Sequence, residues 1–195
     1  MKFHQRLAIA LFFPFLLTAL TGVGHRIGRS WLGLPKSFGR AMMTLHEGRF
    51  LGESLIPVYV LVLGLGLLAM IASGFLLFFQ RPTPGLFTAR KIHHLIAPIA
   101  ALPLIVSGIT GISYRLGRAW FGLSKEQAAI FLSIHQGTYL GPTLRPFYIL
   151  LIGLGAIAIL LSGVQLIPEV RQHLILPLRK IGKRFKNSTV DENPT

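Results

Sequence analysis

The sequence predicts an all-α integral membrane protein with four transmembrane helices, formed by two tandem parallel helical-hairpin repeats with short interfacial helices in the long loops. Two observations predict this fold class. Of the 195 residues, 52% are hydrophobic and only 13% are charged, which excludes a disordered chain and is too apolar for an ordinary soluble enzyme. The second observation is an internal repeat, since 2–76 aligns without a gap with 91–165 and 27 of the 75 paired residues are identical.

Four stretches without a charged residue supply the predicted spans. A helix crosses the roughly 30 Å core of a bilayer with about 20 residues. The stretches are Leu7–Gly24, Ser54–Gln80, Leu95–Tyr114 and Pro146–Pro168. Because two spans return the chain to its starting side, both copies should have the same orientation and be related by a pseudo-twofold axis along the membrane normal.

The repeat also divides the chain into parts. Residues 1–80 form the first two-span repeat, 81–90 a link, 91–168 the second two-span repeat, and 169–195 a basic, partly disordered tail. In the long loops, Lys36–Arg49 and Lys125–Thr138 have apolar residues near helical spacing, which predicts a short amphipathic helix that stops at Gly48 or Gly137. The basic tail and link favour a cytoplasmic location for both termini.

Composition excludes several kinds of site. The chain has no cysteine, which excludes disulfides, iron–sulfur clusters and covalently attached c-type haem. The net charge of +14 comes from basic residues that flank the spans, where they meet anionic headgroups. The lipid bilayer, and no nucleic acid, is therefore the expected partner.

Four of the seven histidines form two pairs at equivalent repeat positions. His4 and His93 open the first span of each copy, whereas His46 and His135 precede the second span at the opposite face. The two histidines of each pair should face each other across the pseudo-twofold axis at one membrane level. A six-coordinate b-type haem requires this arrangement. We therefore predict that these four histidines ligate two haems b. The other interpretations are that they are interfacial anchors or that they ligate chlorophyll.

Further residues are candidates for cofactor binding. Small residues on the His4 face of the first span, Ala8, Thr18 and Gly22, and their copies would leave room for a porphyrin or for a neighbouring helix. Arginines and tyrosines near the loops could clamp or cap haem propionates, or could belong to an interfacial belt. These residues are Arg26, Arg29, Arg115, Arg118, Tyr59 and Tyr148. The unpaired His25, His94 and His173 are interpreted as interfacial.

The paired motifs resemble the PepSY-associated transmembrane helix family. In that family a histidine opens a span that ends in Thr-Gly, and a Leu-His-x-Gly-like motif precedes a span that ends in a small residue and Gly. The matching residues are Phe3-His4…Thr21-Gly22, Ile92-His93…Thr110-Gly111, Leu45-His46-Glu47-Gly48…Ser73-Gly74 and Ile134-His135-Gln136-Gly137…Ser162-Gly163. Larger members include ferric-siderophore reductases that hold two haems, so the resemblance implies the same role for the four histidines. The loops are too short for a PepSY domain. The chain also resembles short cyanobacterial members, which implies a thylakoid or plasma-membrane location.

These observations predict a b-type di-haem membrane cytochrome that carries single electrons across the bilayer, towards ferric iron or quinone. Such a protein would be an electron-transfer protein or a reductase, without a catalytic base or nucleophile, and would need a redox partner. The alternative is a non-catalytic membrane subunit or assembly factor whose repeats pack against a larger, for example photosynthetic, complex.

Overall fold

The computed structural model describes residues 2–80, 89–170 and 172. Of these residues 89% are helical and none lies in a strand, so the predicted all-α class is confirmed. Four helices are long and apolar enough to cross a membrane, as the four uncharged stretches predict. They are α1 (Lys2–Ser30), α3 (Ile56–Gln80), α4 (Ala89–Ala119) and α6 (Gly141–Val164).

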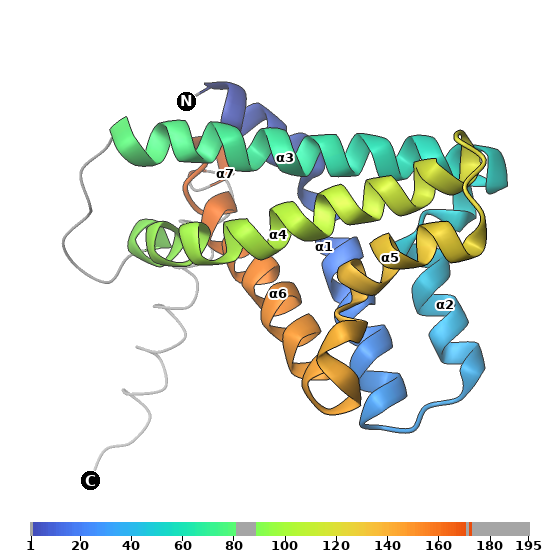
Figure 1. The fold of residues 1–195 in the computed structure, drawn as a ribbon. Helices are drawn as coiled ribbons and strands as arrows, with labels where there is room; N and C mark the ends of the chain where they lie inside the picture. The colour runs from blue at the N-terminus through green and yellow to red at the C-terminus, as the bar shows by residue number, and fades with distance from the viewer. Residues whose placement is uncertain (1, 81–88, 171, 173–195) are drawn as a thin grey trace, which may run out of the picture.

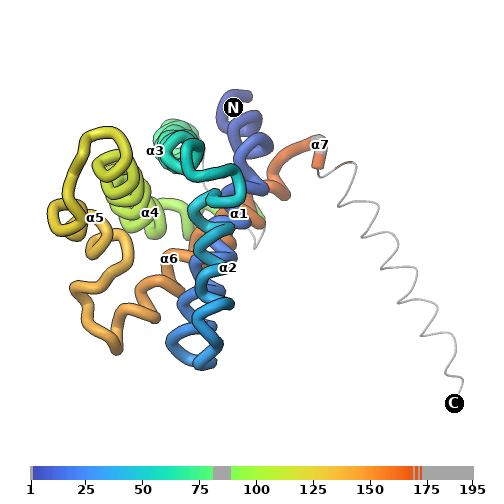
Figure 2. Tube along the Cα trace, turned by 90° about the vertical axis from the view of Figure 1, so that its right-hand side faces the viewer, coloured from blue at the N-terminus to red at the C-terminus, as the bar shows by residue number. Residues whose placement is uncertain are grey.

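The four long helices form a closed bundle. Helix α1 contacts α3 and α6, and α4 contacts the same two helices, so α1 and α4 lie on opposite sides of the bundle axis. Figure 1 shows that the first residues of α1 and α4 lie at the end where α3 and α6 finish, and Figure 2 views α3 and α4 nearly along their axes. We call this end the terminal end and the opposite one, which carries the long loops, the loop end.

Two short helices cover the loop end. Helix α2 (Lys36–His46) packs on α1, and α5 (Lys125–Gln136) packs on α4. In Figure 1, α2 runs crosswise to α3. Both short helices lie within the predicted amphipathic segments and stop where predicted, because Gly48 (φ 73°) and Gly137 (φ 64°) adopt the left-handed conformation that glycine tolerates best. Ser124 begins α5 with a capping box formed with Gln127.

Short 3₁₀ turns connect these helices to the following spans. They are η1 (Arg49–Leu51), η2 (Glu53–Leu55) and η3 (Thr138–Leu140), and a last short helix, α7 (Pro168–Val170), follows α6.

Glycines allow the long helices to approach closely. A Cβ atom at Gly64 of α3 would overlap the Ile112 side chain of α4, and a Cβ atom at Gly153 of α6 would overlap Val23 of α1. The two contacts join residues at equivalent positions of the two sequence copies. These glycines therefore act in helix packing, as small residues commonly do between membrane helices.

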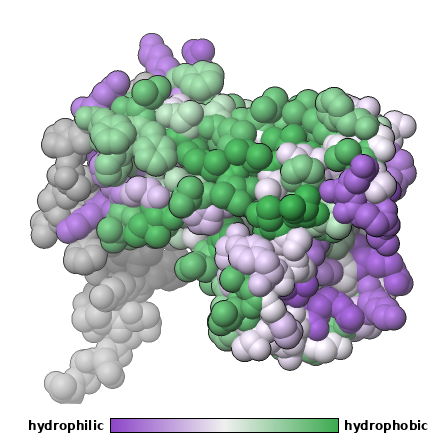
Figure 3. All heavy atoms as spheres, in the orientation of Figure 1, coloured by the Kyte–Doolittle hydropathy of each residue, from purple (hydrophilic) through white to green (hydrophobic). Residues whose placement is uncertain are grey.

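Surface polarity follows the bundle axis. In Figure 3, apolar residues cover the middle of the bundle, whereas polar residues gather at the loop end and again near the N-terminus. This distribution suits helices whose middle sections contact lipid. Most of the predicted link and tail, together with His173, lies outside the described residues.

Candidate functional site

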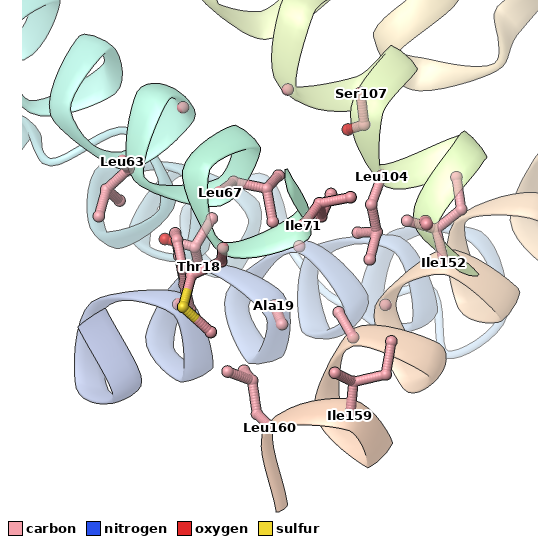
Figure 4. Close-up of a pocket in the computed structure, with 18 of the residues that line it drawn as sticks. Thr18, Ala19, Leu63, Leu67, Ile71, Leu104, Ser107, Ile152, Ile159 and Leu160 are labelled. Atoms are coloured by element: carbon pink, nitrogen blue, oxygen red, sulfur yellow. The ribbon is translucent and has the colours of Figure 1, made fainter. Parts of the chain in front are cut away.

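A partly open cavity of about 580 Å³ lies between the four long helices. A volume of this size is typical of small-molecule and cofactor sites. Figure 4 shows apolar side chains from all four helices pointing into this space, among them Leu67, Leu104, Ile152 and Ile159. The cavity extends along the bundle axis, because all four paired histidines line it, two near each end. The residues that the sequence pairs thus share one interior space.

His46 and His135 meet at the loop end. Their ring centroids are 6.4 Å apart and their planes differ by 57°. Each histidine is the last or nearly the last residue of a short helix, and α2 and α5 carry the two rings back along α1 and α4 into the cavity. The sequence-predicted pairing at this end therefore matches the positions of the rings.

Hydrogen bonds fix the tautomer of this pair. The Nδ1 atom of His46 lies 2.9 Å from the carbonyl oxygen of Thr18, and that of His135 lies 2.9 Å from the carbonyl oxygen of Ser107. A carbonyl can only accept a hydrogen bond, so each Nδ1 must carry the proton and each neutral ring keeps its lone pair on Nε2. Burial, together with the neighbouring His135, lowers the pKa of His46 to about 4, and burial also lowers the pKa of His135. Both rings are therefore neutral near pH 7 and can bind a metal through Nε2.

His4 and His93 have equivalent partners at the terminal end. The His4 Nδ1 atom lies 2.8 Å from Ser73 Oγ, and the His93 Nδ1 atom lies 3.1 Å from Ser162 Oγ. Each serine hydroxyl donates its own proton to a carbonyl oxygen one turn earlier, so its oxygen is left to accept a proton from the imidazole. His93 also contacts the carbonyl oxygen of Ile159 at 3.2 Å. Among the described residues, no side chain or backbone group hydrogen-bonds to Nε2 of any of the four histidines.

A glycine lies beneath each of the four imidazoles. A Cβ atom at Gly22 would lie 3.2 Å from His46 Cε1, and one at Gly111 would lie 3.2 Å from His135 Cε1. At the terminal end the corresponding glycines are Gly74 below His4 and Gly163 below His93, at 3.4 and 3.2 Å. The small residues of the first span were expected to leave room for a porphyrin or a helix. At Gly22 and Gly111 this room is occupied by the ring of a ligand candidate, because the short helices fold back onto α1 and α4.

The six candidate arginines and tyrosines separate into two groups. Arg26, Arg115 and Tyr59 line the loop end of the cavity. Arg29 and Arg118 are exposed and instead donate hydrogen bonds to the loop carbonyls of Leu34 and Leu123, so they brace the turns that precede α2 and α5. Tyr148 is outside the cavity lining; its ring packs against Gly137 and lies 6.3 Å from the Tyr139 ring.

Two of the unpaired histidines also reach the cavity. His25 Nδ1 contacts the carbonyl oxygen of Gly39 at 3.1 Å, and the His94 ring stacks on Phe78 with centroids 4.3 Å apart. Both side chains line the cavity, at the loop end and the terminal end respectively. In the part of the chain that the structure describes, histidine and acidic side chains form no cluster of three that could hold a metal ion. Any metal site in this part of the chain would therefore have to rest on the two-histidine pairs.

Sequence reasoning missed three polar residues at the loop end. Glu47 forms an ion pair with Arg115 at 2.5 Å, and Arg145 donates to the side-chain oxygen of Gln136 at 2.5 Å. These three residues, Glu47, Gln136 and Arg145, line the cavity together with Arg115. Arg145 is not a duplicated residue, because Ile56 stands at its equivalent position. Glu47 and Gln136 also differ between the copies, although their place directly after the paired histidines was a signal that could have identified them.

Comparison of the chain with protein-family models, with curated proteins and with solved structures finds no match. The geometry of the cavity and of its four histidines therefore carries the functional argument.

Proposed function

We propose that this protein is a b-type di-haem membrane cytochrome that carries single electrons across the bilayer. The observation that carries the proposal is the spacing of His46 and His135. An imidazole nitrogen binds a transition metal at about 2.0–2.1 Å and lies roughly 1.1 Å from its ring centroid, so two imidazoles on opposite sides of one metal have centroids about 6.3 Å apart. The centroids of this pair are 6.4 Å apart.

The protonation of the rings supports the same role. A histidine that ligates a metal usually donates its other N–H to a carbonyl or to another polar group, which orients the ring and raises the basicity of the ligating nitrogen. Thr18 and Ser107 provide such carbonyl oxygens at 2.9 Å. At the terminal end the hydroxyl groups of Ser73 and Ser162 accept the corresponding protons. Each of the four Nε2 atoms therefore keeps a lone pair with which it can bind a metal.

The two histidine pairs lie at well-separated levels of the bundle. His46 contacts Thr18, which lies 14 residues after His4 on α1, a separation of about 21 Å along a helix axis. A haem b with two imidazole ligands supplies a one-electron ferric/ferrous couple. Around it the chain would contribute the imidazole nitrogens, a mainly apolar lining and cationic groups at the loop end.

The finer architecture belongs to the same proposal. We interpret each half of the chain as one copy of a parallel two-span repeat, supported by the equivalent contacts of Gly64 with Ile112 and of Gly153 with Val23. The motif resemblance to PepSY-associated transmembrane helices also supports this interpretation. A bacterial plasma membrane or thylakoid, with both termini cytoplasmic, and a separate donor and acceptor such as quinone or ferric iron complete the proposal.

An absorption spectrum of the detergent-purified protein from haem-replete cells tests the proposal. We expect sharp α and Soret bands on reduction and two haems per chain. His46→Ala and His135→Ala should each remove one and the same haem, and His4→Ala and His93→Ala should each remove the other. His25→Ala and His94→Ala are matched controls, since they remove cavity-lining histidines outside the pairs and should leave both haems in place.

Three results would contradict the proposal. A colourless preparation would favour a packing subunit or assembly factor, and chlorophyll bands would favour a pigment protein. If only one member of a pair affects its haem, the two histidines do not share one iron.

A further inference from the structure

The charges at the loop end break the symmetry of the two copies. Arg115 of α4 pairs with Glu47 at 2.5 Å, and Glu47 also binds Arg49 at 2.8 Å. At the equivalent position to Glu47 the second copy has Gln136, which bears no charge. Arg26, the equivalent of Arg115, therefore lacks the carboxylate that symmetry would give it.

A second arginine increases this imbalance. Arg145 donates to both the backbone and the side-chain oxygen of Gln136, at 3.1 and 2.5 Å. It lies close enough to Arg26 for the two positive charges to repel. Both side chains line the cavity and are partly buried. Among the described residues, neither arginine has a carboxylate within ion-pair distance.

Buried polar atoms without partners occur along the same cavity. Within the described part of the chain, three buried side-chain N or O atoms have no hydrogen-bond partner, namely Thr18 Oγ1, Arg26 Nε and Tyr59 Oη. All three residues line the cavity. A buried donor left without an acceptor destabilises the fold, more so when it is charged, so such atoms mark a place where a ligand group can complete the bonding.

We propose that Arg26, Arg145 and Tyr59 form an anion site at the loop end of the cavity, which binds a carboxylate on one side of the pseudo-twofold axis. Guanidinium groups suit carboxylates because they donate two parallel hydrogen bonds and keep their charge when buried. On the other side of the axis Glu47 already neutralises Arg115. A ligand with carboxylates at one edge would therefore bind in one orientation.

The carboxylate could come from two sources. If the proposed function holds, on which this inference rests, it is a propionate of the haem that His46 and His135 ligate. Otherwise it is the head of a free apolar acid whose chain fills the apolar cavity. The two sources share their chemistry, and matched acids and esters distinguish them.

The experiment compares each acid with its uncharged ester on the whole detergent-purified protein. The probes are haem against haem dimethyl ester, and palmitate against methyl palmitate, with binding followed by absorption for the haems and by thermal shift for the lipids. The variants are Arg26→Gln, Arg145→Gln and Gln136→Glu. The controls are Arg29→Gln and Arg118→Gln, whose side chains bind loop carbonyls outside the cavity.

We expect the wild-type chain and both controls to prefer an acid over its ester by about tenfold or more, the effect of one or two charge-assisted hydrogen bonds. Arg26→Gln and Arg145→Gln should remove most of this preference. Gln136→Glu is nearly isosteric and supplies an internal carboxylate, so it should also remove the preference while raising the melting temperature of the ligand-free protein. A purely structural role for the arginines would change melting temperature without changing the acid-to-ester ratio.

The outcomes separate this proposal from the proposed function. If haem binds and the variants abolish the preference for haem over its ester, propionate binding is supported. If no haem binds, the proposed function fails, and a palmitate preference that the variants abolish still supports the anion site. If acids and esters bind alike in both series, or if the three variants behave like the controls, the anion site is overturned even where haem binds.

Discussion

Glu47, the residue after α2, forms a 2.5 Å ion pair with Arg115 of α4 and so joins the first half of the chain to the second. The two side chains are only 20% and 18% exposed, so solvent screens their attraction less than it does at a fully exposed pair. Glu47 directly follows His46. Gly111 lies beneath the His135 ring, and Arg115 is one helical turn beyond Gly111. The ion pair therefore helps to hold the two rings at their separation.

Replacing Glu47 by Gln should destabilise the protein. The change leaves Arg115 partly buried without its counter-charge, which we expect to cost about 1–3 kcal/mol and to weaken binding of the haem proposed for the loop end. Glu53→Gln is the matched control, because Glu53 is 79% exposed and its pair with Arg49 should contribute less than about 1 kcal/mol. Denaturant unfolding in detergent measures the free energy of unfolding of both variants. Equal losses would show that the Glu47–Arg115 pair stabilises the protein no more than the exposed Glu53–Arg49 pair does.

The two terminal-end serines should differ in their effect on haem binding. Ser73 Oγ accepts from His4 at 2.8 Å, and the Met70 carbonyl is a weaker backbone acceptor for the same ring. The His93 proton has a second acceptor at 3.2 Å, the Ile159 carbonyl, when Ser162 is lost. Loss of such a partner typically weakens metal affinity by about 10–100-fold. For the haem proposed at the terminal end, we therefore expect Ser73→Ala to lower the affinity and shift the midpoint potential more than Ser162→Ala does; the reverse order would contradict this account.

Gly48 should tolerate alanine poorly for two separable reasons. At φ 73° an L-residue costs roughly 1–2 kcal/mol, and the new Cβ atom would also lie 2.5 Å from Tyr59 Cδ1. Gly33 isolates the first effect, because its φ is 61° but a Cβ atom added there would have no neighbour within 4 Å. Gly48→Ala should therefore lower the melting temperature clearly more than Gly33→Ala and should disturb the haem site proposed at His46. Similar shifts for the two variants would mean that the Tyr59 contact relaxes freely.

The packing at Gly153 offers a rescue experiment. Gly153→Ala should separate α6 from α1 because the added methyl group overlaps Val23, and overpacking of this kind costs about 1–3 kcal/mol. Val23→Ala in the same chain removes the obstructing methyl groups and should recover part of the loss. Gly155→Ala serves as control, since its Cβ would meet Ala100 at an ordinary 3.6 Å. Failure of the double variant to recover any melting temperature would show that the α1–α6 contact is not limited by this pair.

The apolar, uncharged stretches of the sequence predicted the all-helical class and the four long helices. The length of each uncharged stretch was sufficient to predict the four long helices. A glycine after an amphipathic segment was sufficient to predict where α2 and α5 end. The pairing of His46 with His135 followed from their equivalent positions. These features depend on local sequence and on topology, which a single chain records directly.

The detailed contacts of the site could not be predicted in the same way. The Thr18 carbonyl that accepts from His46 is a backbone group, which no sequence motif identifies. The function of Gly22 depended on how α2 folds back onto α1, and equivalence between copies does not reveal such neighbours. Arg145 has no duplicate at all. Comparison of the two copies finds only the residues that both copies contain, so it could not identify a residue such as Arg145 that only one copy has.

The two histidine pairs are attached to the bundle in different ways. His4 and His93 belong to the spanning helices themselves, whereas His46 and His135 lie on short helices that have a left-handed glycine shortly before their start and just after their end. A bilayer of different thickness tilts spanning helices. Such a tilt would move His4 and His93 directly. At the other end, the backbone at the glycines that flank α2 and α5 can rotate, so His46 and His135 would move less. The two histidine pairs, and the haems proposed for them, would then respond unequally to the lipid composition of the host membrane.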